Sequence, residues 1–502
     1  MHLGTRVDHL SLLSEGEKAA IYDAALEILA DVGMAVHHPA AVRLLLEAGC
    51  RLTDDERVLV PAHLVDGART TAPSVVRVFD RLGRPAMELG GRRSYFGTGS
   101  DLLNTYDLET GEHRPSSLDD VARAARLVDA LDNLDFVMSS AYPNEVAGEL
   151  SCLLSFVTMV RNTVKPVVTV AYSGTDLEAI RAVAAVLRGG DERLRELPSF
   201  IVYDEPTSPL QHPVDSVDKL LLCADAGVPV CYVPAQMAGA TAPITVAGQM
   251  ALGTAESLFG LVLHQLRRPG APFIYGHGHP VLDMQTAQST YNSVEGYLCE
   301  LGMAEMAKWF DLPNFGNAGT SDSQLVDAQA GIDIAMETLL VMQAGSNLNH
   351  NAGYLDFGLT GSLEGIVITD EVIAMCRRLV AGITVDAEHL AVDVVAEVGP
   401  GGHYLGQKHT RRHRGDQWRP TILNRLRRDV WEAEGAPDLR TRAGEKARAI
   451  LRDHEPPPLA ADDDASIDRL LAEYLSRSEG EAAQAGLPPA HAMRPARPVD
   501  NA

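Results

Sequence analysis

The feature of this chain that most restricts its fold is an alternation of short apolar segments with long amphipathic ones between residues 116 and 410. Eight short segments are predicted as strands because they are apolar and bounded by turn residues: Asp135–Met138, Pro166–Val170, Ser199–Val202, Val228–Cys231, Pro272–Tyr275, Asn314–Phe315, Ser346–Asn349 and Ile383–Val385. Successive strands start about thirty to forty-five residues apart, the length of one strand–helix unit. Such a series favours an α/β fold, a closed (β/α)8 TIM barrel, over an open doubly wound sheet.

The segments on either side of the barrel are predicted to be accessory. Residues 1–115 are expected to form an N-terminal helical cap, followed by a small strand pair made of Val75–Phe79 and Arg93–Phe96. Residues 116–410 form the barrel. Residues 411–502 are expected to form a charged helical extension that is rich in Pro, Asp and Ala from Glu455 on and ends in a flexible tail of about twenty residues.

Composition excludes several classes of function. A net charge of −25 repels phosphate backbones and anionic membranes, so we expect neither a nucleic-acid nor a membrane partner. The same charge favours encounter with a cationic ligand. Six cysteines without a C-x-x-C pair are typical of a reducing compartment, and the apolar runs are too short to span a bilayer. We therefore expect a cytoplasmic protein.

The candidate site residues are those that follow the predicted strands, because a parallel barrel places its site on the loops at the carboxyl ends of its strands. These residues are strongly polar and aromatic: Tyr142, Tyr172, Tyr203, Asp204, Glu205, Gln236, His277, His279, Asn317, Asp322, His350, Asn351, Tyr354 and Asp386. Several tyrosines and a carboxylate around one opening suit a quaternary ammonium ion, since each ring face contributes about 0.5–2 kcal/mol to holding a cation. A single such tyrosine could equally pack as an amphipathic rim residue.

A second interpretation of the same loops is a divalent metal site. His277 and His279 lie two residues apart and should face the same side of an extended chain, with His350 and Asp386 at the ends of later strands. A His-x-His pair with a late Asp is typical of metal-dependent barrel hydrolases. These histidines could instead hydrogen-bond a polar substrate or the loop backbone.

An ordered set of short motifs resembles the trimethylamine methyltransferase family over about residues 15 to 455. The motifs are Phe96–Asp101, Asp107–Glu112, Asp135–Ser139, Ser208–Leu210, Gly319–Ser323, Asp327–Ala330, Gly353–Asp356, Gly361–Glu364 and Gly399–Leu405 with His409–Thr410. Because only ordinary residues occur between Gly316 and Tyr354, the chain resembles the branch without pyrrolysine, which includes glycine betaine methyltransferases.

The resemblance implies a methyltransferase that moves a methyl group from a quaternary or tertiary amine to the Co(I) of a corrinoid. It implies no tightly bound cofactor and no metal of its own, because a separate corrinoid protein supplies the cobalamin. We also expect a homo-oligomer. His350 lies where betaine-type relatives use a histidine against the substrate's polar end, and it is the predicted catalytic residue. Tyr142, Tyr172, Tyr203, Asp204, Glu205, Gln236, His277, His279, Asn351 and Tyr354 are the predicted substrate-binding residues.

Two departures from the family pattern concern the substrate. Asn351 stands where many relatives are expected to carry Asp, and Asp204-Glu205 stands where an amide would suit a carboxylate-tailed substrate. Acids at that position repel a betaine carboxylate, so either they pair with another group or the substrate tail is not anionic. A metal-dependent TIM-barrel hydrolase and a non-catalytic betaine-binding protein remain the alternatives.

Overall fold

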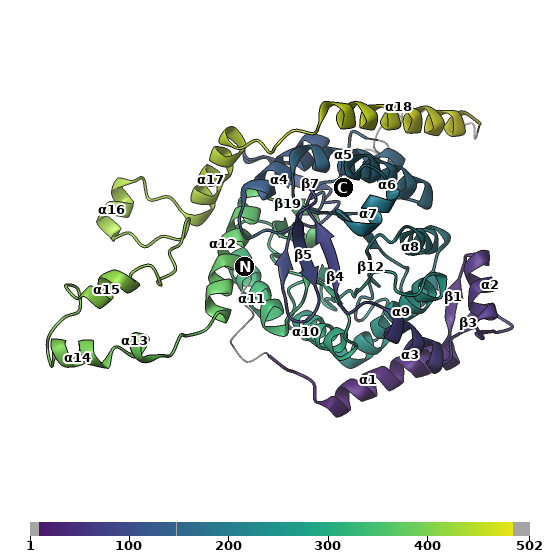
Figure 1. Ribbon diagram of the computed structural model, residues 1–502, viewed down its shortest axis with the longest axis horizontal. Coiled ribbons are helices and arrows are strands. Elements are labelled where there is room, and N and C mark those ends of the chain that lie inside the picture. The colour runs from purple at the N-terminus through teal and green to yellow at the C-terminus, as the bar shows by residue number, and fades with distance from the viewer. Residues whose placement is uncertain (1–9, 147, 485–502) are drawn as a thin grey trace.

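Helices surround a central ring of short strands, as Figure 1 shows. The computed structural model describes residues 10–146 and 148–484. The predicted flexible tail therefore lies almost entirely outside the described residues. The fold is a mixed α/β fold, as the alternating pattern predicts.

The ring is built from parallel pairings that close on themselves. Its members are β6 (Tyr95–Phe96), the pair Phe136-Val137, β9 (Val167–Thr169), β10 (Phe200–Asp204), β12 (Val230–Tyr232), β13 (Phe273–Tyr275), β16 (Phe315–Asn317) and β17 (Leu348–His350). Each pairs in parallel with the next, from Gly97 opposite Phe136 round to Leu348 opposite Tyr95. All carboxyl ends therefore lie at one end of the ring.

The predicted strand at Ile383–Val385 is wrong. The side chains of Ile383 and Val385 are 84% and 72% exposed, and the segment is not a strand. Its place in the ring is taken by β6, whose Tyr95 N–H donates to the Asn347 carbonyl at 2.7 Å. The β-branched composition of Ile383-Thr384-Val385 imitates a strand, but pairing needs a neighbour, and β6 already occupies that edge.

The predicted strand pair of the N-terminal segment is also wrong in its partners. β4 (Val76–Phe79) pairs antiparallel with β5 (Pro85–Leu89), not with the segment around Tyr95. Residues 80–84 form the loop of this hairpin, in which the Gly83 N–H donates to the Asp80 carbonyl and Gly83 adopts a φ of 82°. Because β6 belongs to the ring, the ring contains residues from before and after the domain boundary predicted at residue 115. The boundary at residue 410 stays a prediction.

The β4–β5 hairpin closes the amino end of the ring. Val76, Val78, Met87 and Leu89 are buried against the inward-facing side chains of the ring, among them Tyr95, Phe136, Val168, Ile201, Cys231, Ile274, Phe315 and Leu348. The Phe79 N–H donates to the carbonyl of Pro198, which precedes β10. Figure 1 shows β4 and β5 lying across the middle of the ring. A ligand can therefore approach the interior from the carboxyl end only.

The helices that cover the ring alternate with its strands. They are α4 (Leu118–Ala130), α5 (Gly148–Asn162), α6 (Gly174–Arg188), α7 (Asp191–Glu196), α8 (Val214–Ala226), α9 (Val246–Arg267), α10 (Val294–Trp309), α11 (Ala328–Ala344) and α12 (Leu363–Val380). The amino ends of α6, α10, α11 and α12 are capped by the side chains of Ser173, Ser293, Asp327 and Ser362, respectively. Helix α9 has the length and composition of a membrane-crossing helix, but 78% of its apolar window is buried, as in the core helix of a globular fold.

The N-terminal segment packs against α9 and is helical, as predicted. It contains α1 (Glu15–Glu27), a π-helical turn (Ile28–Val32), α2 (Pro39–Glu47) and α3 (Ala62–Thr71). Between them β1 (Met34–Val36), β2 (Arg51–Leu52) and β3 (Arg57–Leu59) form a small sheet that β11 (Gln211–His212) extends. Loops at the carboxyl end carry β7 (Asn104–Tyr106), β8 (His113–Pro115), β14 (Val281–Leu282), β15 (Ser289–Thr290), β18 (Tyr354–Leu355), a 3-10 turn (Asp356–Gly358) and β19 (Thr360–Gly361).

Residues 381–438 leave the ring as an extended arm. The arm carries α13 (Ala387–Leu390), α14 (Val392–Val398), α15 (Lys408–His413) and α16 (Arg428–Ala433), and Figure 1 shows it projecting away from the helices of the ring. The chain returns in α17 (Leu439–Asp453), which packs on α12 and α4, and continues in α18 (Ala461–Gln484) along α6.

Candidate functional site

Tyr203 and Glu205 point into the open end of the ring because successive side chains of a strand alternate between its faces. The Tyr203 ring lies 5.4 Å from Phe315 and 6.2 Å from the ring of His350, centroid to centroid. The Tyr203 hydroxyl donates to Oε2 of Glu205 at 3.2 Å. Strands β10, β16 and β17 thus bring a phenol, an imidazole and a carboxylate together.

Glu205 is an exposed carboxylate in a poorly solvated place. Its side chain reaches solvent, yet desolvation raises its pKa to about 7 against the lowering effect of the Tyr203 hydrogen bond. A carboxylate that faces a narrow opening, with protein on most sides, has both properties. At neutral pH it is partly ionised and can take up a cation.

Two groups missed by the sequence analysis join this opening. Tyr291, on the loop after β15, interacts with Glu205, and burial together with that charge raises its pKa to about 12. Asp101, on the loop after β6, is exposed but poorly solvated, and desolvation raises its pKa to about 6 against the Ser139 hydrogen bond. Asp101 was missed because β6 was not recognised as a ring strand; Tyr291 lies too far beyond β13 for strand-end reasoning to reach it.

Tyr354 completes the inner group. It is buried, its hydroxyl donates to the Ser100 carbonyl, and it interacts with Tyr291 and Asp101. Gly99 is required beside it, because a Cβ there would lie 2.4 Å from the Tyr354 hydroxyl oxygen. We call Asp101, Tyr203, Glu205, Tyr291, His350 and Tyr354 the inner mouth.

His350 is a neutral hydrogen-bond acceptor at the inner mouth. Its Nδ1 lies 2.9 Å from the Gly316 carbonyl, so Nδ1 carries the proton and Nε2 is the acceptor. Desolvation lowers the pKa of His350 to about 4. The ring packs on Phe315 with centroids 4.2 Å apart. A side chain fixed in this way can position a ligand but carries no positive charge at neutral pH.

Tyr142 and Tyr172 lie on the outer rim. Tyr172 is 59% exposed, and Tyr142 is partly buried with an electrostatic interaction to both Asp101 and Tyr172. Both follow ring segments, as predicted. They lie around the same opening as the inner mouth but have more contact with solvent.

Two predicted substrate-binding residues are engaged elsewhere. Asp204 is fully buried on the outer face of β10, where its Oδ1 lies 3.0 Å from Nζ of Lys219. Gln236 is also fully buried; it donates to the Gly278 carbonyl at 3.0 Å and packs against Gly253 of α9. The sequence places each residue at a strand end but does not show which face its side chain takes.

His277, His279 and Asn351 belong to a buried polar network behind the strand ends. Nδ1 of His279 lies 3.2 Å and Nδ1 of His277 lies 3.7 Å from Oε2 of Glu300 in α10. Asn351 donates to Asn317, whose Nδ2 lies 2.9 Å from Nδ1 of His279. The two histidines do face one side, as predicted, but that side carries Glu300.

Charges in this network are fixed by the ion pair. Burial alone would raise the pKa of Glu300, but the neighbouring histidines lower it to about 2. Burial lowers the pKa of His277, so this ring is neutral, whereas Glu300 outweighs burial and raises the pKa of His279. Glu300 therefore favours the protonated form of His279 more than that of His277.

The divalent metal site that the sequence suggested at the mouth would lack its predicted Asp ligand. Asp386 lies in the arm, where its Oδ1 accepts from Nδ1 of His389 at 2.7 Å, and not at a ring strand. Without Asp386, the hydrolase arrangement that the sequence suggested is not assembled.

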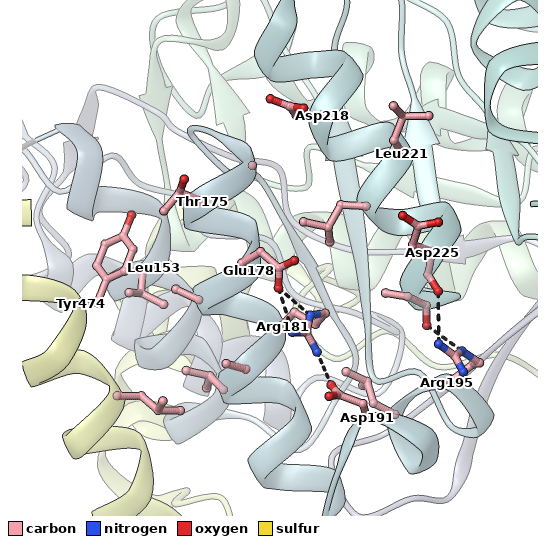
Figure 2. A pocket seen from close by; sticks show the side chains of 18 of the residues that line it. Leu153, Thr175, Glu178, Arg181, Asp191, Arg195, Asp218, Leu221, Asp225 and Tyr474 are labelled. Atoms are coloured by element: carbon pink, nitrogen blue, oxygen red, sulfur yellow. Dashed lines mark hydrogen bonds and ion pairs between the residues drawn. The ribbon is translucent and has the colours of Figure 1, made fainter. Parts of the chain in front are cut away.

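A separate groove of about 910 Å³ lies outside the ring, between α6 and α8 with α18 along one side (Figure 2). On one side of it Arg181 pairs with Glu178 and Asp191, and Arg195 donates to the Asp225 carbonyl. None of the predicted site residues lines this groove. Arg181, Arg195 and Arg267, which line it, are already paired with acidic side chains or carbonyls, and the opening of the ring remains the candidate site.

Comparison with known proteins gives consistent results. A model of the trimethylamine methyltransferase (MTTB) family matches residues 2–483. The trimethylamine methyltransferase MttB of Desulfitobacterium hafniense is 33% identical over 454 residues, 90% of this chain and 91% of the relative. The glycine betaine methyltransferase of Desulfitobacterium hafniense strain Y51 is 28% identical over 474 residues, 94% and 98% of the two chains.

A crystal structure of the Methanosarcina barkeri monomethylamine methyltransferase (MtmB) covers 89% of this chain and 96% of its own, with 10% identity and a TM-score of 0.48. That likeness is too weak to support an argument about fold or function. The match to the family model and to the relatives carries the assignment. It confirms the family expected from the ordered motifs: this chain belongs to the trimethylamine methyltransferase family, whose members are methyl-transferring enzymes.

Proposed function

We propose that the closed ring is a (β/α)8 barrel whose carboxyl end binds a quaternary or tertiary amine, and that the chain transfers a methyl group from this amine to the Co(I) of a corrinoid carried by a separate protein. The observation that carries the proposal is the inner mouth, where Glu205 and Asp101 lie among Tyr203, Tyr291 and Tyr354. Family membership supports the reaction.

The inner mouth suits a cation that has no N–H to donate. A methylated ammonium ion is stabilised by ring faces and by carboxylates, and needs no directed hydrogen bond to its nitrogen. Tyr203, Tyr291 and Tyr354 keep their protons, because burial raises the pKa of each. Lys219, the one lysine acting on Glu205 within the described chain, is tied to Asp204, so the charge of Glu205 remains for the ligand.

Of the two acids Asp204 and Glu205, only Glu205 is in a position to act on the tail of the substrate. Asp204 pairs with Lys219, but Glu205 faces the opening and, within residues 10–146 and 148–484, its hydrogen bond comes from a tyrosine hydroxyl. Glycine betaine, the substrate in the name of one relative, carries a carboxylate that Glu205 would repel. We therefore favour a quaternary amine with an uncharged tail, such as a choline-type alcohol.

The chain's own contribution is positioning and electrostatics. The methyl carbon passes to the nucleophile, and the electron pair of the C–N bond stays on nitrogen, which leaves as a neutral amine. No general acid or base is required. Glu205 and the phenols hold the ammonium group, and Nε2 of His350 accepts a hydrogen bond from the tail of the substrate. The corrinoid, when bound, supplies the nucleophile.

The open end of the ring also fits a docking partner. Leu103, Ile244, Met284, Leu325 and Leu359 lie on the loops around the opening, and each is between 40% and 68% exposed. Exposed apolar side chains on a functional face are typical of a protein interaction surface. Because the β4–β5 hairpin closes the other end, we propose that the corrinoid protein covers this face, with both proteins in the cytoplasm.

The test is a methyl-transfer screen with reduced cobalamin as acceptor. Choline, glycine betaine, proline betaine, carnitine and trimethylamine are each incubated with the protein, and the demethylated amine is measured. Turnover of one amine, absent when boiled protein is used, supports the proposal. Binding of amines without any Co(I)-dependent product would instead indicate a betaine-binding protein and overturn the reaction.

A further inference from the structure

The arm contains a cluster of metal-ligating side chains that methyl transfer does not use. One ligand atom each of His389, His413 and Asp416 lies within 4.8 Å of the other two. His389 comes from α13, His413 from α15 and Asp416 from the loop that follows. The cluster thus joins parts of the chain that α14 and the loop after it separate.

The surroundings of the cluster resemble those of a metal centre. Oδ1 of Asp386 lies 2.7 Å from Nδ1 of His389, which leaves Nε2 of His389 for a metal. A carboxylate behind a ligating imidazole is the usual second partner of such a histidine. His409 precedes His413 by one turn of α15, with ring centroids 4.3 Å apart, and its Nε2 lies 3.1 Å from the Glu388 carbonyl.

A second observation concerns His413. Its Nε2 is buried and has no hydrogen bond among the described residues, although Oε1 of Glu388 lies 3.3 Å away. Its other nitrogen, Nδ1, lies 2.7 Å from Oδ2 of Asp416. Nδ1 of His413 and Oδ2 of Asp416 thus already lie side by side, as two ligands of one metal would, while Glu388 faces the other ring nitrogen.

The arm also lacks the apolar core that would otherwise fix its shape. Within residues 381–438, no residue of α13, α14, α15 or α16 is buried, and Leu390, Val392 and Leu405 are 60–83% exposed. Short segments without a core generally need a disulfide, a metal or a partner to hold one structure. The cysteines of this chain lie outside the arm, so a disulfide is not the answer.

We propose that His389, His413 and Asp416 bind one zinc ion that cross-links α13 to α15 and fixes the fold of the arm. Imidazole and carboxylate ligands suit zinc, with ligand atoms about 2.0–2.2 Å from the metal, so small side-chain rotations close the site. The ion is structural: all three ligands lie in the arm, away from the inner mouth. This proposal is independent of the proposed methyl transfer.

The experiment measures zinc bound to the full chain after dialysis at neutral pH. We expect about one zinc per chain in the wild type and at least tenfold less in the His389→Ala/His413→Ala double variant. The matched control is His403→Ala, an exposed histidine of the same arm outside the cluster, which should keep its zinc. Loss of zinc from His277→Ala but not from the double variant would place the ion in the barrel and overturn the proposal.

Substitutions at His413 separate a metal site from an ion-pair cluster. His413→Cys can still bind zinc as a thiolate but cannot pair with Asp416 as a cation, whereas His413→Lys does the reverse. We expect zinc to remain in the cysteine variant and to be lost from the lysine variant. The opposite result would show that the cluster holds charges and not a metal.

Limited trypsin digestion gives a readout without metal analysis. The arm offers Arg411, Arg412, Arg414 and Arg419 to the protease. We expect a chelator to speed cleavage there at least tenfold in the wild type and added zinc to restore protection, with neither effect in the double variant. Equal cleavage with and without chelator in the wild type would show that zinc does not fix the arm.

Discussion

Replacing Glu205 with Gln removes the carboxylate at the centre of the inner mouth while nearly preserving its shape. If Glu205 holds the ammonium ion, the variant should bind cations more weakly and lose part of the pH dependence of binding. The ionised form attracts the cation, so in the wild type the dissociation constant should fall as the pH rises through about 7, the pKa of Glu205, and then level off.

The size of the effect follows from Coulomb's law. Two unit charges about 4 Å apart interact by ~4 kcal/mol at an effective dielectric constant of about 20, and by ~1 kcal/mol in bulk water. Glu205 reaches solvent, so its interaction with a bound cation should lie between these limits. We expect a loss of about 2 kcal/mol, or a roughly thirty-fold rise in the dissociation constant.

Isothermal titration calorimetry with tetramethylammonium is the assay, because this ion has no tail to interact elsewhere. Glu196→Gln is the matched control: it makes the same change of charge on α7, just before the amino end of β10. The step that remains near pH 6 in Glu205→Gln should disappear when Asp101→Asn is added, since Asp101 titrates at about 6. Equal affinities in the wild type and Glu205→Gln at pH 8 would refute the assignment of Glu205 to the cation site.

Three further predictions concern other residues of the ring. Tyr291→Ala should weaken tetramethylammonium binding about tenfold by removing a ring worth roughly 1.4 kcal/mol, while Tyr291→Phe keeps it; equal affinities in both variants exclude a ring contact. His350→Ala should abolish demethylation in a protein that still folds and unfolds cooperatively, and wild-type turnover would remove His350 from the site. Glu300→Gln should cost about 3–5 kcal/mol of unfolding free energy at pH 7. Because the folded pKa of Glu300 is lowered to about 2, that difference should shrink as the pH falls from about 4.5 toward 2, and urea titrations that show a constant difference contradict it.

The strands of the ring could be predicted where their composition is apolar and each is followed by its helix. The segments around Val167, Phe200, Val230 and Phe273 have this form, and the structure confirms them. β6 was predicted as a strand but not as a member of the ring, because Tyr95-Phe96 is short and its partners in β17 lie more than 250 residues away. Local composition contains no information about a pairing partner so far away in the sequence. The β-branched segment Ile383–Val385 is therefore predicted as the eighth strand instead of β6.

The site could be predicted only to the level of strand ends. Reading those ends finds Tyr203, Glu205 and His350, but it cannot separate Glu205 from Asp204, whose side chain turns to Lys219 on α8. The polar composition of strands β16 and β17 likewise reflects contacts with residues outside these strands. A Cβ at Gly316 would lie 2.4 Å from Oε1 of Glu300, so the strand is shaped by a charge on α10 that its own sequence does not show.

The tyrosine hydroxyl groups of the inner mouth limit which substrate tails can be bound there. The hydroxyls of Tyr203 and Tyr354 already donate to Glu205 and to Ser100, so of the three tyrosines of the inner mouth, all within the described residues, Tyr291 has its hydroxyl proton left for a ligand. His350 offers an acceptor, not a donor. A carboxylate tail would therefore meet one donor and two acids, and Glu205 would tolerate it better when protonated. Ionised Glu205 attracts the ammonium group of both ligands, but it also repels the carboxylate of glycine betaine. Affinity for glycine betaine should therefore rise less, as the pH rises through about 7, than affinity for a cation with a neutral tail, and equal slopes would contradict a mouth that disfavours a carboxylate tail.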